Sequence, residues 1–192
     1  MRELLVVHEG FRDYGGMSGS AMEALAQGVH EAADERIVGH YVDQVAYLAS
    51  LLREAGVPIV LPPGAHAVFL DAKRFLPHVP QEEFPAQALA AAIYLAGGVR
   101  AMERGIVSGQ HGSEPYHGLE LVRLTLPRRV YTQEHLTYVA EVVADLYAQA
   151  RGIHGLHMTY EPPHLRFFQA RFEPREPFSI GGIETAQPVT TV

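Results

Sequence analysis

The sequence of 192 residues contains no cysteine and a single lysine, Lys73, among its 15 basic residues. Without cysteine the chain cannot form a disulfide, a thiolate zinc site, an iron–sulfur cluster or a cysteine nucleophile. A compositional bias toward arginine accounts for the scarcity of lysine without invoking any function. The consequence is the same in either case: chemistry that requires a lysine amine must use Lys73 or a lysine from elsewhere.

Long apolar runs are also missing. No run approaches the roughly 18 residues that a membrane span needs, so we expect no membrane segment. The apolar stretch Leu4–Val7 is too short for a signal peptide and has no small-residue cleavage site, which favours a cytoplasmic protein. The net charge of −7 argues against a nucleic-acid partner bound by phosphate neutralisation.

Familiar catalytic motifs are absent from the sequence as well. No nucleophile elbow lies between a strand and a helix, and no glycine-rich phosphate loop ending in Lys-Ser or Lys-Thr is present. The closest histidine spacings are His154 with His157 and His111 with His117. Neither pair has a third ligand at motif spacing, so we expect no metal site.

What the sequence does contain is a succession of helical and extended patterns. Apolar residues at helical spacing predict two helices between residues 20 and 55, with a break near Asp34, and two more over 82–96 and 132–152. Short apolar runs predict strands at residues 4–7, 57–60, 67–70, 99–104, 120–126, 157–161 and 165–172. From Glu173 on, prolines and glycines predict a flexible tail without packed structure. The expected class is α/β, of the α+β kind, with helices covering a small antiparallel sheet.

Two arginines on predicted strands are candidates for binding an anion. If Val122 and Leu124 face the core, strand alternation places Arg123 on the opposite face. An arginine fixed on a strand can hold a carboxylate through two parallel hydrogen bonds. An ordinary surface arginine fits the same pattern, and both interpretations apply equally to Arg104.

Adjacent aromatic residues interrupt the alternation of the last predicted strand. Phe167 and Phe168 would point to opposite faces of a strand over 165–172. One of them would then pack in the core while the other lines a pocket. Burial of both rings in the core is the competing interpretation.

Several long motifs, in order along the chain, make the sequence resemble the C-terminal part of the β-eliminating lyases. This family contains the tyrosine phenol-lyases and the tryptophanases, which are pyridoxal-phosphate enzymes of the aspartate-aminotransferase-like fold. The matching segments are Glu9–Phe11 with Tyr14–Gly16, Gly64–Asp71, Phe84–Gln87, Val122–Thr125 with Pro127–Arg128, and Tyr160–Pro162 with Leu165–Arg166.

Three residues bring the chain closer to the tyrosine phenol-lyases within this family. Arg104 occupies the place of an arginine near the phenol hydroxyl, Met102 matches the same pattern, and Phe167 stands where tryptophanases carry a histidine. The resemblance implies cleavage of L-tyrosine to phenol, pyruvate and ammonia. The alternatives are cleavage of L-tryptophan to indole, pyruvate and ammonia, and a non-catalytic remnant or small-molecule binding module.

The resemblance also assigns roles to individual residues. Arg123 would bind the α-carboxylate of the aromatic amino acid, and Arg104 would act in catalysis at its ring, beside Met102, Phe167 and Phe168. His66 and Tyr14 would lie near the cofactor or the active site. The implied cofactors are pyridoxal phosphate and a monovalent cation such as K⁺, and the implied assembly is a homotetramer.

The cofactor-binding lysine of the family lies upstream of the segment that this sequence resembles, so the chain alone is expected to be inactive. Residues 1–33 would be the incomplete end of the large cofactor-binding domain, residues 34–172 the small C-terminal domain, and residues 173–192 the tail. Three explanations are open: a split or truncated gene, a fragment that assembles with a separate N-terminal chain, and a remnant. Lys73 falls at a variable basic position of the small domain.

Overall fold

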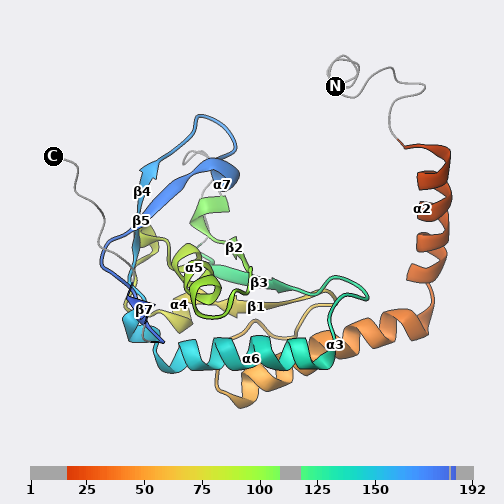
Figure 1. Cartoon of the computed structure of the whole chain (residues 1–192), viewed down its shortest axis with the longest axis horizontal. Helices are drawn as coiled ribbons and strands as arrows, with labels where there is room; N and C mark the ends of the chain where they lie inside the picture. The colour runs from red at the N-terminus through yellow and green to blue at the C-terminus, as the bar shows by residue number, and fades with distance from the viewer. Residues whose placement is uncertain (1–16, 109–117, 182, 185–192) are drawn as a thin grey trace. The chain divides into compact units, whose positions relative to one another are not determined.

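The computed structural model describes residues 17–108, 118–181 and 183–184 (Figure 1). The chain divides into two compact units, residues 1–40 and 41–192. Tyr14 and the strand expected at residues 4–7 lie outside the described residues.

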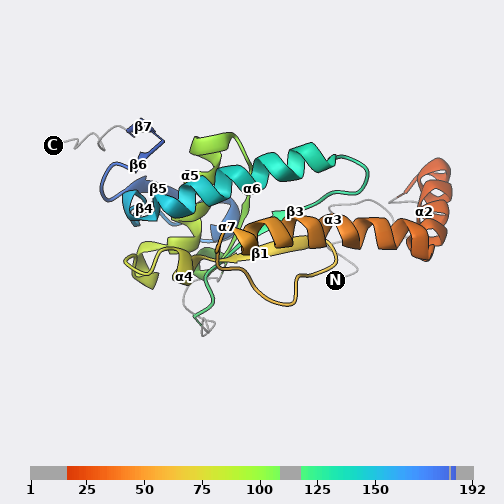
Figure 2. The same ribbon diagram turned by 90° about the horizontal axis from the view of Figure 1, so that it is seen from below.

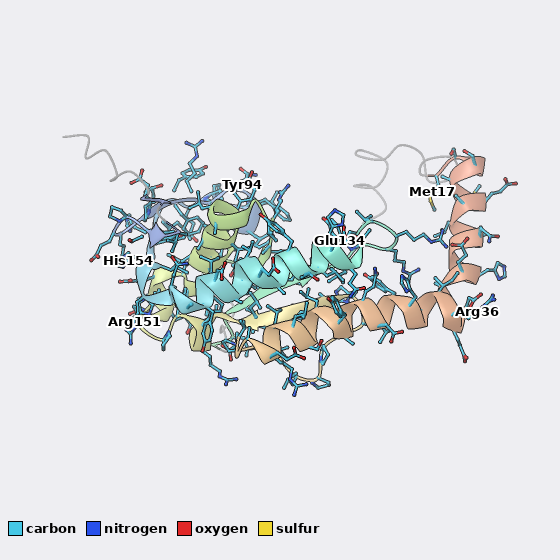
Figure 3. All side chains as sticks on the ribbon, turned by 60° about the horizontal axis from the view of Figure 1, so that its bottom comes forward. Met17, Arg36, Tyr94, Glu134, Arg151 and His154 are labelled. Carbon is cyan, nitrogen blue, oxygen red and sulfur yellow. The ribbon has the colours of Figure 1, made fainter. Side chains whose placement is uncertain are left out.

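The first unit contains helix α2 (Gly19–Ala32) and the beginning of helix α3 (Glu35–Glu54). Ser18 caps α2, because its Oγ accepts a hydrogen bond from the backbone N–H of Ala21 at 3.3 Å. Asp34 Oδ1 accepts from Arg36 N at 2.9 Å at the start of α3, which confirms the expected break between the two helices. Arg36 is labelled at this helix start in Figure 3. None of the side chains of α2 is buried.

The second unit is built around one hydrophobic core. Helix α3 contributes four buried residues at helical spacing, Val45, Leu48, Ala49 and Leu52. Helix α6 (Gln133–Ala148) lies beside α3 (Figure 2), and Tyr47 Oη is 3.0 Å from Thr137 Oγ1 between them. Helix α5 (Pro85–Gly97) packs against α6 and against the sheet. The helices predicted over 82–96 and 132–152 are confirmed, with short 3₁₀ turns η1 (Gln81–Glu83) and η3 (Ala150–Gly152) at their ends.

The ends of α6 follow from local chemistry. Thr132 stands at its N-cap, where the Thr132 N–H donates to His135 Nδ1 at 3.2 Å in a capping-box arrangement. Figure 3 shows Glu134 in the first turn of α6 and Arg151 just beyond its other end. An acidic first turn and a basic residue after the last turn both suit the helix dipole.

The main sheet has three antiparallel strands in the order β1–β3–β2. Strand β1 spans Ala67–Asp71, β2 spans Met102–Arg104, and the central strand β3 spans Leu121–Thr125. The expected strand at 57–60 is wrong as a full strand, because only an isolated bridge joins Ile59 to Leu70. Pro58 lacks the N–H that a longer ladder would use.

One face of this sheet is covered by the core and the other is not. Val68 and Leu70 of β1 lie opposite Leu124 and Val122 of β3, and all four side chains are buried. The residues between them, including Arg123, therefore lie on the second face, which we call the open face. The predicted orientation of Arg123 is confirmed.

Two strands in the C-terminal part of the chain form a second, separate sheet. Strand β4 (Leu156–Tyr160) pairs with β5 (Arg171–Pro174), and the short helix α7 (Arg166–Gln169) lies between them. The prediction of one strand over 165–172 is wrong, because Phe167 and Phe168 both belong to α7. Helix α4 (Ala72–Phe75) and the 3₁₀ turn η2 (Ile106–Ser108) follow β1 and β2.

The expectation of an unpacked tail from residue 173 is wrong for the residues described there. Strands β6 (Ser179–Ile180) and β7 (Ile183–Glu184) form a hairpin after β5. Phe178 and Ile180 are buried in the core. Residues 185–192 lie outside the described residues.

The second unit is thus a mixture of helices and small antiparallel sheets, as predicted. Within the part of the chain that the structure describes, no helix combines the length and the apolar character needed to cross a membrane.

Candidate functional site

The candidate site is the row of side chains on the open face of the sheet. Met102 of β2 and Phe69 of β1 both lie opposite Arg123 of the central strand. Arg104 follows Met102 by two residues, so it shares this face. Arg104 and Arg123 are diagonal neighbours on adjacent strands, typically about 7–8 Å apart. The two arginines proposed from the sequence therefore lie on the same surface.

Arg123 is half-buried and has few hydrogen-bond partners. Its Nη2 donates to Met102 Sδ at 2.7 Å, and a thioether is a weak acceptor. Its buried Nε has no hydrogen-bond partner among the described residues. A guanidinium in this condition retains donors that a carboxylate could accept in parallel.

Arg104 is exposed and lies over an aromatic ring. Its Cζ is 6.0 Å from the centroid of the half-buried Phe167 ring, within range of a cation–π interaction. Phe168 is 75% exposed and meets Phe167 edge-on, with ring centroids 5.0 Å apart and an interplanar angle of 85°. Neither phenylalanine is a core residue, so burial of both rings and burial of one of them are both wrong.

Arg166 attaches helix α7 to the turn that follows Arg104. Its Nη1 forms an ion pair with Glu161 Oε1 at 3.0 Å, and its Nη2 donates to the backbone carbonyl of Ile106. The Arg166 side chain is only 11% exposed, so these bonds are partly shielded from water. Through them, the helix that carries Phe167 is held next to the strand that carries Arg104.

Two carboxyl groups lie behind this turn, and the sequence reasoning did not identify either. Glu103 is 3% exposed and Glu120 is 1% exposed. Burial raises the pKa of Glu103 to about 7, against a bond from Ser108 that lowers it. Burial also raises the pKa of Glu120, and N–H donors from Ile106 and Ala86 oppose that rise. Strand alternation places Glu103 on the covered face, since Met102 and Arg104 share the open one. This alternation was the signal from which the burial of Glu103 could have been predicted.

The remaining candidates lie elsewhere. His66 is exposed just before β1, and its carbonyl accepts from Leu126 N at 3.0 Å, at the end of the sheet away from Arg104. Lys73 is exposed on α4, where its Nζ is 3.3 Å from the position that a Cβ on Gly118 would take. Tyr14 is outside the described residues. Among the described residues, no group of three or more His, Asp or Glu side chains could hold a metal ion.

Comparison with protein families gives one match, to the β-eliminating lyases, over residues 16–142. This range includes β1, β2 and β3 and therefore both open-face arginines. It ends before α7 and its two phenylalanines.

Individual relatives carry the comparison further along the chain. The sequence is 58% identical over 177 residues to a tyrosine phenol-lyase of Symbiobacterium sp. (strain SC-1) and 57% identical over 177 residues to that of Pasteurella multocida. It is 54% identical over 176 residues to a tyrosine phenol-lyase of Nostoc punctiforme. Each alignment covers 90% of this chain, but only 38–39% of the relative. The chain thus spans about two fifths of the length of the proteins it resembles.

Proposed function

Because the chain belongs to the β-eliminating lyase family, we propose that it forms the substrate-binding part of a lyase that cleaves L-tyrosine to phenol, pyruvate and ammonia. The observation that carries this proposal is that Arg123, whose buried Nε has no partner among the described residues, shares one sheet face with Arg104, which lies over an aromatic ring. Tyrosine offers a carboxylate at one end and a phenol at the other.

Arg123 would bind the substrate α-carboxylate. Its guanidinium is half-buried, donates to the sulfur of Met102, and keeps a buried Nε without a partner among the described residues. A carboxylate that accepts two parallel bonds would satisfy these donors and fix the orientation of the amino acid.

Arg104 would act on the ring side, beside Met102, Phe167 and Phe168. Phe167 holds the guanidinium by a cation–π contact and offers an edge or face to the substrate ring. The guanidinium would donate a hydrogen bond to the phenolic oxygen while the ring is protonated and leaves. A charge-assisted bond of this kind contributes about 1.5–3 kcal/mol.

The family implies pyridoxal phosphate, but the residues described here do not fit a complete site for it. The cofactor needs a lysine amine, a partner for its ring nitrogen and donors for its phosphate. Lys73 is the only lysine of the sequence, and its ammonium lies beside Gly118 rather than beside Arg123 on the open face. The lysine that binds the cofactor and the K⁺ site would therefore lie in a portion outside these residues.

The domain assignment follows from the same proposal. Residues 1–33 would be the end of the large domain and residues 34–172 the small domain of an aspartate-aminotransferase-like fold. The buried residues Phe178 and Ile180 extend the packed part of this small domain beyond residue 172. A cytoplasmic homotetramer is the form that the family resemblance suggests.

The test is to supply the cofactor-binding portion of a family member, on the same polypeptide or as a separate chain; we call the product the completed lyase. The pyruvate and phenol that it forms from L-tyrosine are then measured. Arg104→Met should lower kcat/KM for L-tyrosine by about ten- to a hundred-fold, the equivalent of one charged hydrogen bond. The same variant should cleave β-chloroalanine normally, because that amino acid has no phenol.

Two outcomes decide against the proposal. Indole from L-tryptophan, without phenol from L-tyrosine, would identify the other activity of the family. Binding of L-tyrosine by calorimetry without any turnover in the completed protein would identify a binding module.

A further inference from the structure

Behind the open face, two buried acidic side chains meet at a glycine. Glu103 lies on β2 between the proposed site residues Met102 and Arg104, but its side chain points to the covered face, and Glu120 immediately precedes β3. A Cβ placed on Gly105 would be 2.7 Å from Glu103 Oε1 and 2.2 Å from Glu120 Oε2. The two carboxyl oxygens are therefore at most about 5 Å apart, a distance at which one negative charge strongly disfavours a second.

The two carboxyl groups differ in their partners. Glu120 Oε1 accepts from the backbone N–H of Ile106 at 2.9 Å and from Gln81 Nε2 at 3.2 Å. Glu120 Oε2 accepts from Ala86 N at 3.3 Å, in the first turn of α5. Lys73 adds a favourable positive charge. These groups and the helix N-terminus favour the ionised carboxylate and oppose the larger effect of burial, which raises the pKa of Glu120.

Glu103 has a poorer environment. Ser108 Oγ donates to its Oε2 at 2.9 Å, and backbone hydrogen bonds from Gly105 and Val107 also lower its pKa. Its buried Oε1, however, has no hydrogen-bond partner among the described residues. An unpaired buried oxygen beside a second carboxylate is accommodated at lowest cost when it carries a proton. Among the described residues, the charged group that acts on Glu103 is Glu120, and Lys73 in turn acts on Glu120.

The same groups fix the turn that carries Arg104. Glu120 accepts a hydrogen bond from the Ile106 N–H, and Glu103 accepts one from Ser108 Oγ. Arg166 of α7 donates to the Ile106 carbonyl. This turn follows Arg104 directly, so its position sets where the guanidinium lies over Phe167.

We propose that Glu103 and Glu120 form a buried carboxyl pair that shares a single proton, and that this pair positions Arg104. Both are positioning residues, since neither shares the open face with Arg104 and Arg123. The role in positioning Arg104 for catalysis rests on the proposed lyase function, whereas the shared proton is a property of the fold alone. When this shared proton leaves, both carboxyl groups are negatively charged beside Gly105, and the turn moves to separate them.

The first experiment measures the titration of the carboxyl pair and does not depend on enzymatic activity. In the 192-residue chain labelled with ¹³C and ¹⁵N, the carboxyl carbon of Glu103 is followed by NMR between pH 4 and 9. We expect a transition near neutral pH, accompanied by shifts of the Arg104 Nε–Hε signal and of the Phe167 ring protons with the same midpoint. A Glu103 transition in the ordinary acidic range, or Arg104 signals that do not follow it, would overturn the proposal.

The second experiment uses variants. Stability is measured by denaturant unfolding from pH 4 to 9 for the parent chain, Glu103→Gln and the control Glu134→Gln, whose carboxyl group is exposed on α6. Since the folded-state pKa of Glu103 lies above the unfolded value, its contribution is fully present below pH 4.5 and is lost as the pH rises to about 7. Glu103→Gln should remove this decline and Glu134→Gln should retain it; an unchanged decline in Glu103→Gln would refute the shared proton. If Glu103→Gln does not fold, the NMR titration of the parent chain decides alone.

The third experiment separates this inference from the proposed function. In the completed lyase, Glu103→Gln should keep kcat/KM for L-tyrosine within about two-fold at pH 7 and should remain active above pH 8, where the parent declines. Glu120→Gln keeps one acceptor oxygen but places an amide NH2 against the N–H group of either Ile106 or Ala86. It should lower kcat/KM at least ten-fold at every pH while leaving β-chloroalanine cleavage intact. If the completed protein has no lyase activity, the proposed function fails, and the NMR midpoints still decide whether the pair positions Arg104. Identical pH profiles for the parent and Glu103→Gln would overturn the positioning role.

Discussion

Met102 and Arg123 lie directly opposite each other on β2 and β3, and Arg123 Nη2 donates a hydrogen bond to Met102 Sδ at 2.7 Å. A thioether orients the guanidinium without neutralising its charge. The guanidinium is thus directed along the open face while its capacity for a carboxylate is preserved. This relationship leads to the first prediction.

Arg123→Lys should raise KM for L-tyrosine in the completed lyase by about ten- to a hundred-fold, because an ammonium cannot replace two parallel bonds to a carboxylate. The matched control is Met102→Leu, which keeps the volume and removes only the sulfur. It should change KM less than ten-fold, since a substitution of this kind usually costs under about 1.5 kcal/mol. Steady-state kinetics measures both, and equal effects of the two variants would show that Arg123 does not bind the carboxylate.

Gly105 should tolerate no side chain. A Cβ there would lie 2.2 Å from Glu120 Oε2, and both carboxyl groups are buried, so something must move. We expect Gly105→Ala to lower the free energy of unfolding by about 1–3 kcal/mol, the usual cost of overpacking. Gly28→Ala in α2 is the control, because nothing lies within 4 Å of its added Cβ. It should leave stability unchanged or raise it by up to about 1 kcal/mol. A Gly105→Ala chain as stable as the parent would mean that the carboxyl groups are further apart than described.

The segment after β5 should contribute to stability. Phe178 is 2% exposed and belongs to the core, whereas Phe168 on α7 is 75% exposed. Phe178→Ala should therefore cost about 3–5 kcal/mol in urea unfolding, and Phe168→Ala about 0.5 kcal/mol or less. Similar small losses in both variants would restore the original expectation of an unpacked tail.

The elements that could be predicted from the sequence are those specified by local patterns. Strand alternation around Val122, Arg123 and Leu124 gave the correct buried and open faces, because a period of two permits only one arrangement once the apolar side is buried. The helices over α3, α5 and α6 followed from apolar spacing in the same way. The orientation of the proposed carboxylate-binding arginine therefore came from pattern alone.

The features that were missed depend on contacts between distant residues. Helix α7 replaces the predicted strand where Arg166 binds the carbonyl of Ile106, sixty positions earlier in the chain. The packed segment after residue 173 depends on Gly152, where an added Cβ would lie 2.0 Å from the carbonyl oxygen of Ser179. The burial of Glu103 depends on pairing with β3 and on Ser108. No local pattern encodes such contacts.

Lys73 should not attach pyridoxal phosphate. It is exposed on α4, and its ammonium lies near Gly118 and the buried Glu120, away from Arg123. We expect the 192-residue chain, incubated with pyridoxal phosphate and reduced with borohydride, to carry no cofactor at Lys73 by peptide mass spectrometry, and to form no pyruvate from L-tyrosine.

Lys73→Arg provides the matched control for this last prediction. It keeps the positive charge near Glu120 and removes the amine, so the completed lyase should retain full activity with this variant. The completing portion supplies the attachment lysine, and its replacement by arginine should abolish activity instead. Cofactor bound covalently to Lys73, together with loss of activity in Lys73→Arg, would show that this chain carries its own attachment site and would contradict the division of roles proposed here.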